Sequence, residues 1–236
     1  MLMEPRDRQK LNLATDTLSA HSSGVKGRIR DGLLSGTILN RWARIGIGAH
    51  DKSRVFANLL THINVDSLEE AYKALDGTKA LGVDSMSKSE YGKNLKENLK
   101  DLENRIHKGT YRPQPKREVL IPKANGKTRP IAIACFEDKL VDWVAGKILT
   151  QVFESLFIKS SFGYRPNKSA DQAIEACYNS LCKNERQQVV EIDFSNFFNT
   201  IPHKKLMRII GKRISDNRFK GLIGRFVTLR QGCLTG

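Results

Sequence analysis

The sequence has no long apolar run, no excess of acidic residues and few cysteines. No apolar run approaches the ~20 residues that a membrane-spanning helix needs. The start, MLMEPRDRQK, lacks the apolar core of a secretory signal. The four cysteines form no CxxC pair and have no histidine cluster beside them. This disfavours a zinc site and favours a reducing compartment, so we expect a cytoplasmic protein with no membrane partner.

Positive charge is abundant where acidic charge is scarce. The 236 residues include 40 Lys and Arg against 25 Asp and Glu, a net charge of +15. Such an excess favours a polyanionic partner, either nucleic acid or an acidic membrane face. A basic protein that is merely soluble is the alternative. Hydrophobic residues make up 39% of the chain, enough for one large domain or two smaller ones.

Periodicity predicts helices, then a hairpin, then helices on either side of one strand. Residues 1–50 are weakly patterned and are interpreted as a flexible or partly helical arm. Ser67 with Glu70 is typical of a capping box, and Gly109 is expected to end a later helix. The expected helices are 67–75, 94–109, 140–157, a segment ending near 182, 203–214 and 219–229, and the expected strand is 188–194. In the segment ending near 182, Ala173, Ile174, Cys177 and Leu181 are expected to face inward. The order indicates a mixed α/β fold with a helical front part.

A single aspartate follows an apolar run in the stretch VVEIDFSNFFNT, residues 189–200. A strand here would place the Asp193 carboxylate at the rim of a sheet, facing a cleft. A hard cation such as Mg²⁺ takes oxygen ligands, often one or two carboxylates together with substrate phosphates. The alternative is that Asp193 only caps the strand or starts a turn. Phe197 and Phe198 follow, and Phe197 is expected in the core.

Two short apolar runs flank Asn125-Gly126 in REVLIPKANGKTRPIAIA. Both residues tolerate positive φ, so the pattern predicts a hairpin. Pro122 and Pro130 cannot donate to a ladder, which indicates an exposed, edge-like hairpin. Its basic residues could close over a triphosphate, lysine as a point charge and arginine as a bidentate donor. These residues are Lys123, Lys127 and Arg129. A solvated charged hairpin is the alternative.

Two further basic features suggest nucleic acid. Arg165 follows aromatic residues in SFGYRPNKSA, a combination suited to backbone contact and base stacking. The stretch His203–Arg230 has nine Lys or Arg, Lys204 and Lys205 among them, and one acid, Asp216. Such a helical face would track a phosphate backbone and bind in a salt-dependent way. An ordinary solvated helix face is the alternative.

Three motifs in this order resemble the group II intron reverse transcriptases, also called intron-encoded maturases. They are YRPQPKREVLIPKANGKTRPIAIACFEDKLVDW, SSFGYRPNKSADQAI and VVEIDFSNFFNTIPHKKLM. The resemblance covers about Leu81 to Gly236. It implies a right-hand polymerase fold, of which residues 81–236 would form the fingers and part of the palm. Residues 1–80 would form a basic, partly helical N-terminal extension that binds RNA.

The resemblance also implies roles for single residues. Lys123 of IPK and Arg129 of TRP would contact the triphosphate of the incoming nucleotide, with Lys127 near the nucleic acid. Arg165 would lie in the fingers near the template or the nucleotide.

In the palm, the resemblance makes Asp193 the first metal-binding aspartate. The backbone of Phe194 would lie beside the metal and the triphosphate. Phe198 would lie under the sugar and disfavour a 2′-hydroxyl, since an aromatic ring excludes a hydroxyl by its volume.

The implied activity is RNA-directed DNA synthesis, with assistance to the splicing of intron RNA. It would use deoxynucleoside triphosphates, an RNA template, a DNA primer and two Mg²⁺ ions. One alternative is an intron-RNA-binding module without catalysis. The other is a reverse transcriptase recruited to phage defence or to a CRISPR locus.

Two parts of the family pattern are absent. The sequence has no Asp-Asp pair and no PQG motif, and Asp142 and Asn199 stand near positions where Gln and Asp are usual. We therefore expect an amino-terminal piece of the enzyme, with one of three metal carboxylates and no polymerase activity by itself. A further chain would complete the site, or exposed apolar surface would cause self-association.

Overall fold

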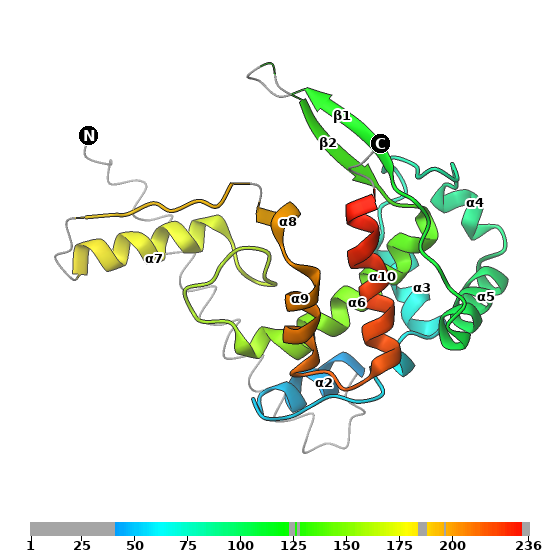
Figure 1. The fold of residues 1–236 in the computed structure, drawn as a ribbon, viewed down its shortest axis with the longest axis horizontal. Coiled ribbons are helices and arrows are strands. Elements are labelled where there is room, and N and C mark those ends of the chain that lie inside the picture. Colours follow the sequence, from blue (N-terminus) through cyan, green and yellow to red (C-terminus); the bar gives the residue numbers. More distant parts are fainter. Residues whose placement is uncertain (1–40, 123–125, 127, 184–187, 196, 233–236) are drawn as a thin grey trace, which may run out of the picture. The chain divides into compact units, whose positions relative to one another are not determined.

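The computed structural model describes residues 41–122, 126, 128–183, 188–195 and 197–232 (Figure 1). The chain divides into two compact units, residues 1–44 and 45–236. The second unit is described below, and helix α2 (Arg41–Ala49) crosses into it. Residues 1–40 of the predicted N-terminal arm lie outside the described residues.

Three helices form the main core, α3 (Val65–Ala74), α5 (Leu95–Lys108) and α6 (Phe136–Phe153). Helix α3 contacts both of the others. Each helix presents an apolar face because its apolar residues recur every three or four positions. The buried residues on these faces include Leu68, Leu99, Leu102, Leu140, Val144 and Ile148. Three short elements border the core, 3₁₀ helices η1 (Leu59–His62) and η2 (Glu154–Leu156) and helix α4 (Lys88–Gly92).

The two basic C-terminal helices are formed as predicted, α9 (His203–Gly211) and α10 (Asn217–Gly232). Asp216 precedes α10, and its Oδ1 accepts from the backbone N–H groups of Arg218 and Phe219, both at 3.0 Å. This is an N-cap arrangement. The other carboxylate oxygen accepts from the Leu60 N–H at 2.9 Å. The one acid of the basic stretch therefore starts α10 and joins it to η1.

The ends of two predicted helices can be compared directly. Gly109 ends α5 with φ of 75°, as expected for a left-handed C-cap. The predicted start of α3 at Ser67 was wrong, because the helix begins at Val65 behind the cap residue Asn64. Asn64 Oδ1 accepts from the Ser67 N–H at 3.1 Å, and Ser67 Oγ accepts from the Asn64 N–H at 3.0 Å. Ser67 is thus the third helical residue of a capping box rather than its cap.

The predicted hairpin is confirmed. Strands β1 (Arg117–Pro122) and β2 (Thr128–Ile133) pair antiparallel, with Leu120 opposite Pro130. Gly126 has φ of 76°, in the left-handed region that a tight turn needs. Nearly all positions of both strands are exposed, which agrees with the edge character predicted from the prolines. Within the described part of the chain, this pair is the only sheet.

Three predictions about the region after α6 were wrong. Residues 188–194 form no strand and are exposed throughout. A strand needs a partner, and none of the described segments supplies one. Helix α7 (Ala170–Lys183) is formed, but Ile174 on its expected inner face is 67% exposed. Phe197, expected in the core, begins the short helix α8 (Phe197–Thr200) and is 51% exposed.

Residues 45–80 are part of the second unit. Phe56 forms a parallel bridge with Ile214, next to the start of α10. The Arg213 guanidinium donates to the carbonyls of Ala49 at 3.1 Å and Asp51 at 2.9 Å. The domain boundary predicted between residues 80 and 81 stays a prediction. Among the described helices, none is both long and apolar enough to cross a bilayer.

Candidate active site

A recess of about 750 Å³ brings together residues from three segments. Strand β2 contributes Arg129, the extended segment before α8 contributes Asp193 and Phe194, and α8 contributes Phe198. The remaining lining residues are Ile192, Phe197 and Asn199. Four residues predicted to act together from the sequence therefore line one concave surface. Asp193 lies there on an exposed extended segment rather than at the rim of a sheet.

Aromatic rings form one side of this recess. Phe194 and Phe197 have centroids 6.1 Å apart, and Phe197 and Phe198 are 5.5 Å apart. Tyr164 approaches Phe198 edge-on, with centroids 6.0 Å apart and an interplanar angle of 90°. These separations are typical of interacting aromatic pairs. The row places flat apolar surface beside one cation and one anion, the combination that a nucleotide requires.

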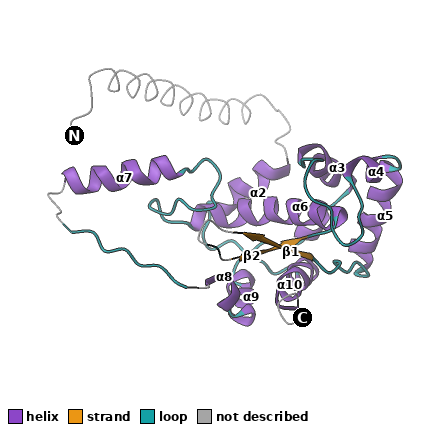
Figure 2. Cartoon of the chain, turned by 90° about the horizontal axis from the view of Figure 1, so that it is seen from above, coloured by secondary structure: helices purple, strands orange, loops and turns teal. Residues whose placement is uncertain are grey.

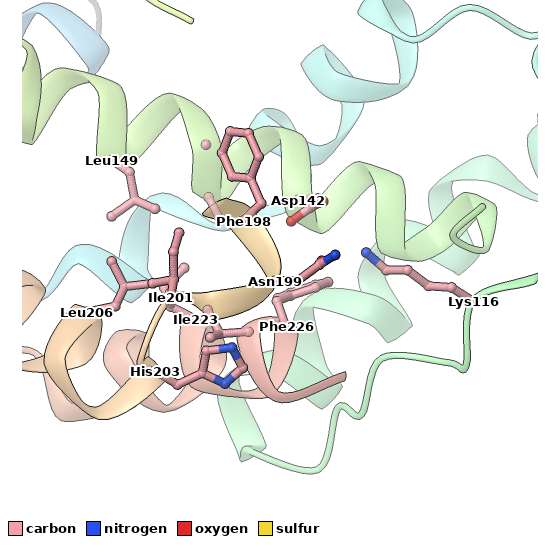
Figure 3. Close-up of a pocket in the computed structure, with 13 residues that line it drawn as sticks. Lys116, Asp142, Leu149, Phe198, Asn199, Ile201, His203, Leu206, Ile223 and Phe226 are labelled. Atoms are coloured by element: carbon pink, nitrogen blue, oxygen red, sulfur yellow. The ribbon is translucent and has the colours of Figure 1, made fainter. Parts of the chain in front are cut away.

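A second pocket of about 280 Å³, which Phe198 also lines, lies between α6, α8, α9 and α10. Figure 2 shows α8, α9 and α10 on one side of α6. Most of the lining is apolar, and Figure 3 shows Lys116, Asp142 and Asn199 near one another at one end. The apolar lining residues include Ala145, Leu149, Ile201, Leu206, Ile223, Phe226 and Val227. Phe198 and Asn199 line both spaces, so α8 borders the recess and this pocket.

Arg165 stabilises the loop to which it belongs. Its Nε and Nη2 donate to one carboxylate oxygen of Glu154 at 3.1 and 2.7 Å. Its Nη1 donates to the carbonyls of Ile158 at 2.9 Å and Ser161 at 2.6 Å. The guanidinium also lies 5.1 Å from the centroid of Phe157, and its side chain is 9% exposed. These contacts use most of its donor capacity, and Arg165 does not line the recess. Its predicted contact with template or nucleotide stays a prediction.

The other predicted basic residues fall into two groups. Lys123 and Lys127 lie outside the described residues. Lys204 and Lys205 are exposed on α9, apart from the recess lining. Three arginines of the same basic stretch donate to main-chain carbonyls within the fold instead, namely Arg213, Arg218 and Arg225. The positive charge of this stretch is therefore partly structural.

Arginines also cover the end of α5. Arg225 donates to the carbonyls of Tyr111 at 3.0 Å and Gly109 at 3.3 Å. Arg112 donates to the same two carbonyls at 2.9 and 2.8 Å. Burial and the nearby Arg112 charge lower the pKa of Arg225. Cations here complement the negative end of the helix dipole.

A buried acid–phenol pair in the core was not predicted from the sequence. Asp138, 3% exposed, accepts from the Tyr111 hydroxyl and from the Gln114 N–H, the latter at 2.9 Å. Burial raises the pKa of Asp138, partly opposed by these two hydrogen bonds. Burial and the Asp138 charge raise the pKa of Tyr111. Asp138 lies in the first turn of α6, ahead of the helix predicted from residue 140, and neither this position nor its partner was predicted from the sequence.

The carboxylates near the recess determine which metal ion the recess could bind. Among the described residues, no group of three or more His, Cys, Asp or Glu side chains could hold a metal ion. Asp193 is the carboxylate that lines the recess among the described residues. The Arg129 side chain lines the recess too and carries the opposite charge. This donor set fits a Mg²⁺ ion that arrives with substrate phosphates. It does not fit a metal site made of protein ligands alone.

Part of this chain matches known proteins in sequence. Residues 121–235 match the family model described as reverse transcriptase (RNA-dependent DNA polymerase). This segment, just under half of the chain, is similar to reverse transcriptases. All residues of the recess lie within it. The chain is also 35% identical over 154 residues to protein YkfC of Escherichia coli K12.

Two further relatives are intron proteins by name. The chain is 33% identical over 132 residues to the group II intron-encoded protein LtrA of Lactococcus lactis. It is 31% identical over 134 residues to the putative COX1/OXI3 intron 2 protein of Saccharomyces cerevisiae. The matches with YkfC, LtrA and the yeast protein take in 64%, 56% and 57% of this chain. They take in only 40%, 22% and 15% of those proteins. The resemblance to group II intron reverse transcriptases stated from the motifs is confirmed.

Proposed function

We propose that this chain supplies the nucleotide-binding part of the active site of a group II intron reverse transcriptase, in a right-hand polymerase fold. The observation that carries the proposal is the recess that gathers Arg129, Asp193, Phe194 and Phe198. These residues come from segments far apart in the sequence. The reaction is attack of a primer 3′-hydroxyl on the α-phosphate of a deoxynucleotide, directed by an RNA template.

The two charged residues bind the triphosphate in this proposal. Arg129 presents a planar donor fork that suits phosphate oxygens. Asp193 binds Mg²⁺ together with those oxygens, and the ion neutralises charge on the triphosphate. The backbone of Phe194 lies beside them. Lys123, predicted next to Arg129 in the hairpin, adds a further cation near the phosphates.

Phe198 is the proposed sugar gate, the ring that excludes a 2′-hydroxyl by its volume. Its side chain is 63% exposed and lines the recess, so it can meet a ligand there. An exposed aromatic ring gains most of the favourable free energy of burial only when a ligand covers it. The sugar face of a nucleotide is a ligand of suitable size.

Catalysis needs more carboxylates than the described residues bring to the recess. Two-metal phosphoryl transfer uses several carboxylates around ions ~3.5–4 Å apart. The sequence has no Asp-Asp pair, so residues beyond these must complete the site. We expect the purified chain alone to give no primer extension. Extension that disappears in Asp193→Asn would contradict this part of the proposal.

The experiment that tests the proposal is nucleotide binding. Calorimetry with dTTP and Mg²⁺ is expected to show binding that weakens about tenfold or more in Arg129→Ala. Such a loss corresponds to one hydrogen-bonded charge contact of about 1.5–3 kcal/mol. Arg208→Ala is the matched control, because Arg208 is exposed on α9 and does not line the recess. Equal affinities for the two variants would reject the assignment of Arg129.

RNA is the second proposed partner. The proposed location of the protein is the cytoplasm. The net charge of +15 and the exposed lysines of α9 support it. For a single-stranded RNA, removing two phosphate contacts should lower the slope of log K against log salt by about 1.4. We expect this change in Lys204→Ala/Lys205→Ala. The control pair, Lys96→Ala/Lys100→Ala on α5, removes the same charge from exposed positions elsewhere. An unchanged slope in the α9 variant would rule out this face.

A further inference from the structure

Phe198 borders two separately defined spaces. It lines the recess that holds Arg129 and Asp193, and it also lines the apolar pocket of about 280 Å³ (Figure 3). A ring beside unfilled apolar space can change rotamer without a clash. A side chain that excludes a hydroxyl by its volume must keep its conformation when the hydroxyl approaches. To act as a sugar gate, the Phe198 ring therefore needs a neighbouring side chain that holds it in place.

Two aromatic rings contact Phe198. Phe197 meets it at 5.5 Å between centroids, with an interplanar angle of 72°. Because Phe197 is the adjacent residue of the same short helix, it moves with the gate. Tyr164 meets Phe198 edge-on at 6.0 Å and comes from the loop after α6. Tyr164 is therefore the ring that can fix Phe198 against a separate part of the chain.

The backbone of Tyr164 is strained and its ring is otherwise unused. Its φ of 56° lies in the left-handed region, which costs free energy for a bulky residue. The side chain is 97% exposed, so burial in the core does not offset that cost. A strained conformation that is retained without a packing gain points to a functional reason.

The next residue holds this conformation in place. Arg165 is bound to Glu154 and to the carbonyls of Ile158 and Ser161. Its guanidinium also lies over the ring of Phe157. These contacts anchor the Arg165 side chain. The preceding residue, Tyr164, therefore has little freedom to reorient. The loop thereby presents the Tyr164 ring toward Phe198.

We propose that Tyr164 is a positioning residue for the sugar gate, and that it sets discrimination between deoxyribonucleotides and ribonucleotides by holding the Phe198 ring. This inference rests on the proposed function, because it assumes that Phe198 meets the sugar. Arg165 acts one step further back by anchoring Tyr164. Its role is then indirect, through the loop, rather than contact with the template.

The test compares dGTP and GTP binding, each with Mg²⁺, in the purified chain and three variants. A pocket discriminates against one extra hydroxyl by up to ~100-fold. We expect Phe198→Ala to abolish the preference for dGTP and Tyr164→Ala to reduce it by roughly tenfold, mainly through tighter GTP binding. Tyr164→Phe keeps the ring and should retain the wild-type ratio. Because Tyr164 is exposed, none of its variants should alter folding.

The outcomes separate this inference from the proposed function. If Phe198→Ala relaxes the preference and Tyr164→Ala does not, the gate stands and the positioning role is wrong. If Phe198→Ala leaves the ratio unchanged, or the wild-type protein binds neither nucleotide, the proposed function fails and the inference fails with it. A second measurement needs no nucleotide. The aromatic NMR signals of Phe198, identified by their loss in Phe198→Leu, should shift in Tyr164→Ala and not in Tyr164→Phe. Unshifted signals in Tyr164→Ala would also overturn the inference.

Discussion

Asp138 makes the stability of the core depend on pH. Its carboxyl is buried, and burial raises its pKa above the ordinary value near ~3.9. A raised pKa in the folded state means that the contribution of this group to stability is fully present below the unfolded pKa. That contribution is lost as pH rises through the folded pKa. The relevant window therefore begins near pH ~4 and extends upward.

Two substitutions test this pair. In Asp138→Asn the ionising group is gone, so the stability of wild type relative to the variant should fall as pH rises above ~4. In Tyr111→Phe the carboxylate loses a donor, which should destabilise the protein by about 1.5–3 kcal/mol at neutral pH. Urea denaturation from pH 4 to 7 measures both. Wild-type and Asp138→Asn curves that run parallel over this range would contradict the account.

Which site residues the sequence could predict depends on where their partners lie. The motifs singled out Arg129, Asp193 and Phe198 as candidates, and the structure places them in one recess, while their roles stay predictions. The internal contacts of Arg165 were not predictable, because a motif indicates a residue type without showing which carbonyls it meets. The same holds for Asp138, whose partner lies 27 residues away in the sequence.

At the level of secondary structure, the start of α3 has a sharp test. Asn64 Oδ1 satisfies the Ser67 N–H, one of the donors that a helix start leaves without an intrahelical partner. Asn64→Ala should lower the free energy of unfolding by about 1 kcal/mol. Asn64→Asp keeps the acceptor and should be close to wild type. Chemical denaturation measures the difference, and equal losses in both variants would show that the cap is not the cause.

Elements with local signals formed as predicted, and elements that need distant partners did not. The hairpin has its turn and both strands within one stretch, and α5 has its own stop at Gly109. Residues 188–194 have the composition of a strand, but pairing depends on a neighbour that the described segments do not provide. Helix α7 did form, but Ile174 on its apolar stripe is 67% exposed. Periodicity predicts that a face is apolar and does not supply the surface that covers it.

At the scale of the whole molecule, apolar surface gathers around the recess. Val190, Ile192 and Phe194 are 82%, 76% and 70% exposed. Such a cluster is typical of a surface that another polypeptide covers. This agrees with a site that needs further residues for catalysis, and with the expectation of a completing chain or self-association. The fold of residues 45–236 is thus organised around a core of helices, with the candidate site on its less covered part.

The most direct test of the central claim is the Mg²⁺ dependence of nucleotide binding in Asp193→Asn. If Asp193 holds the ion beside the triphosphate, Mg²⁺ should tighten dTTP binding to the wild-type chain by about tenfold or more, on the scale of one charged contact. In Asp193→Asn that enhancement should vanish, while binding without Mg²⁺ should be equal or slightly tighter. An enhancement by Mg²⁺ of the same size in both proteins would contradict the account.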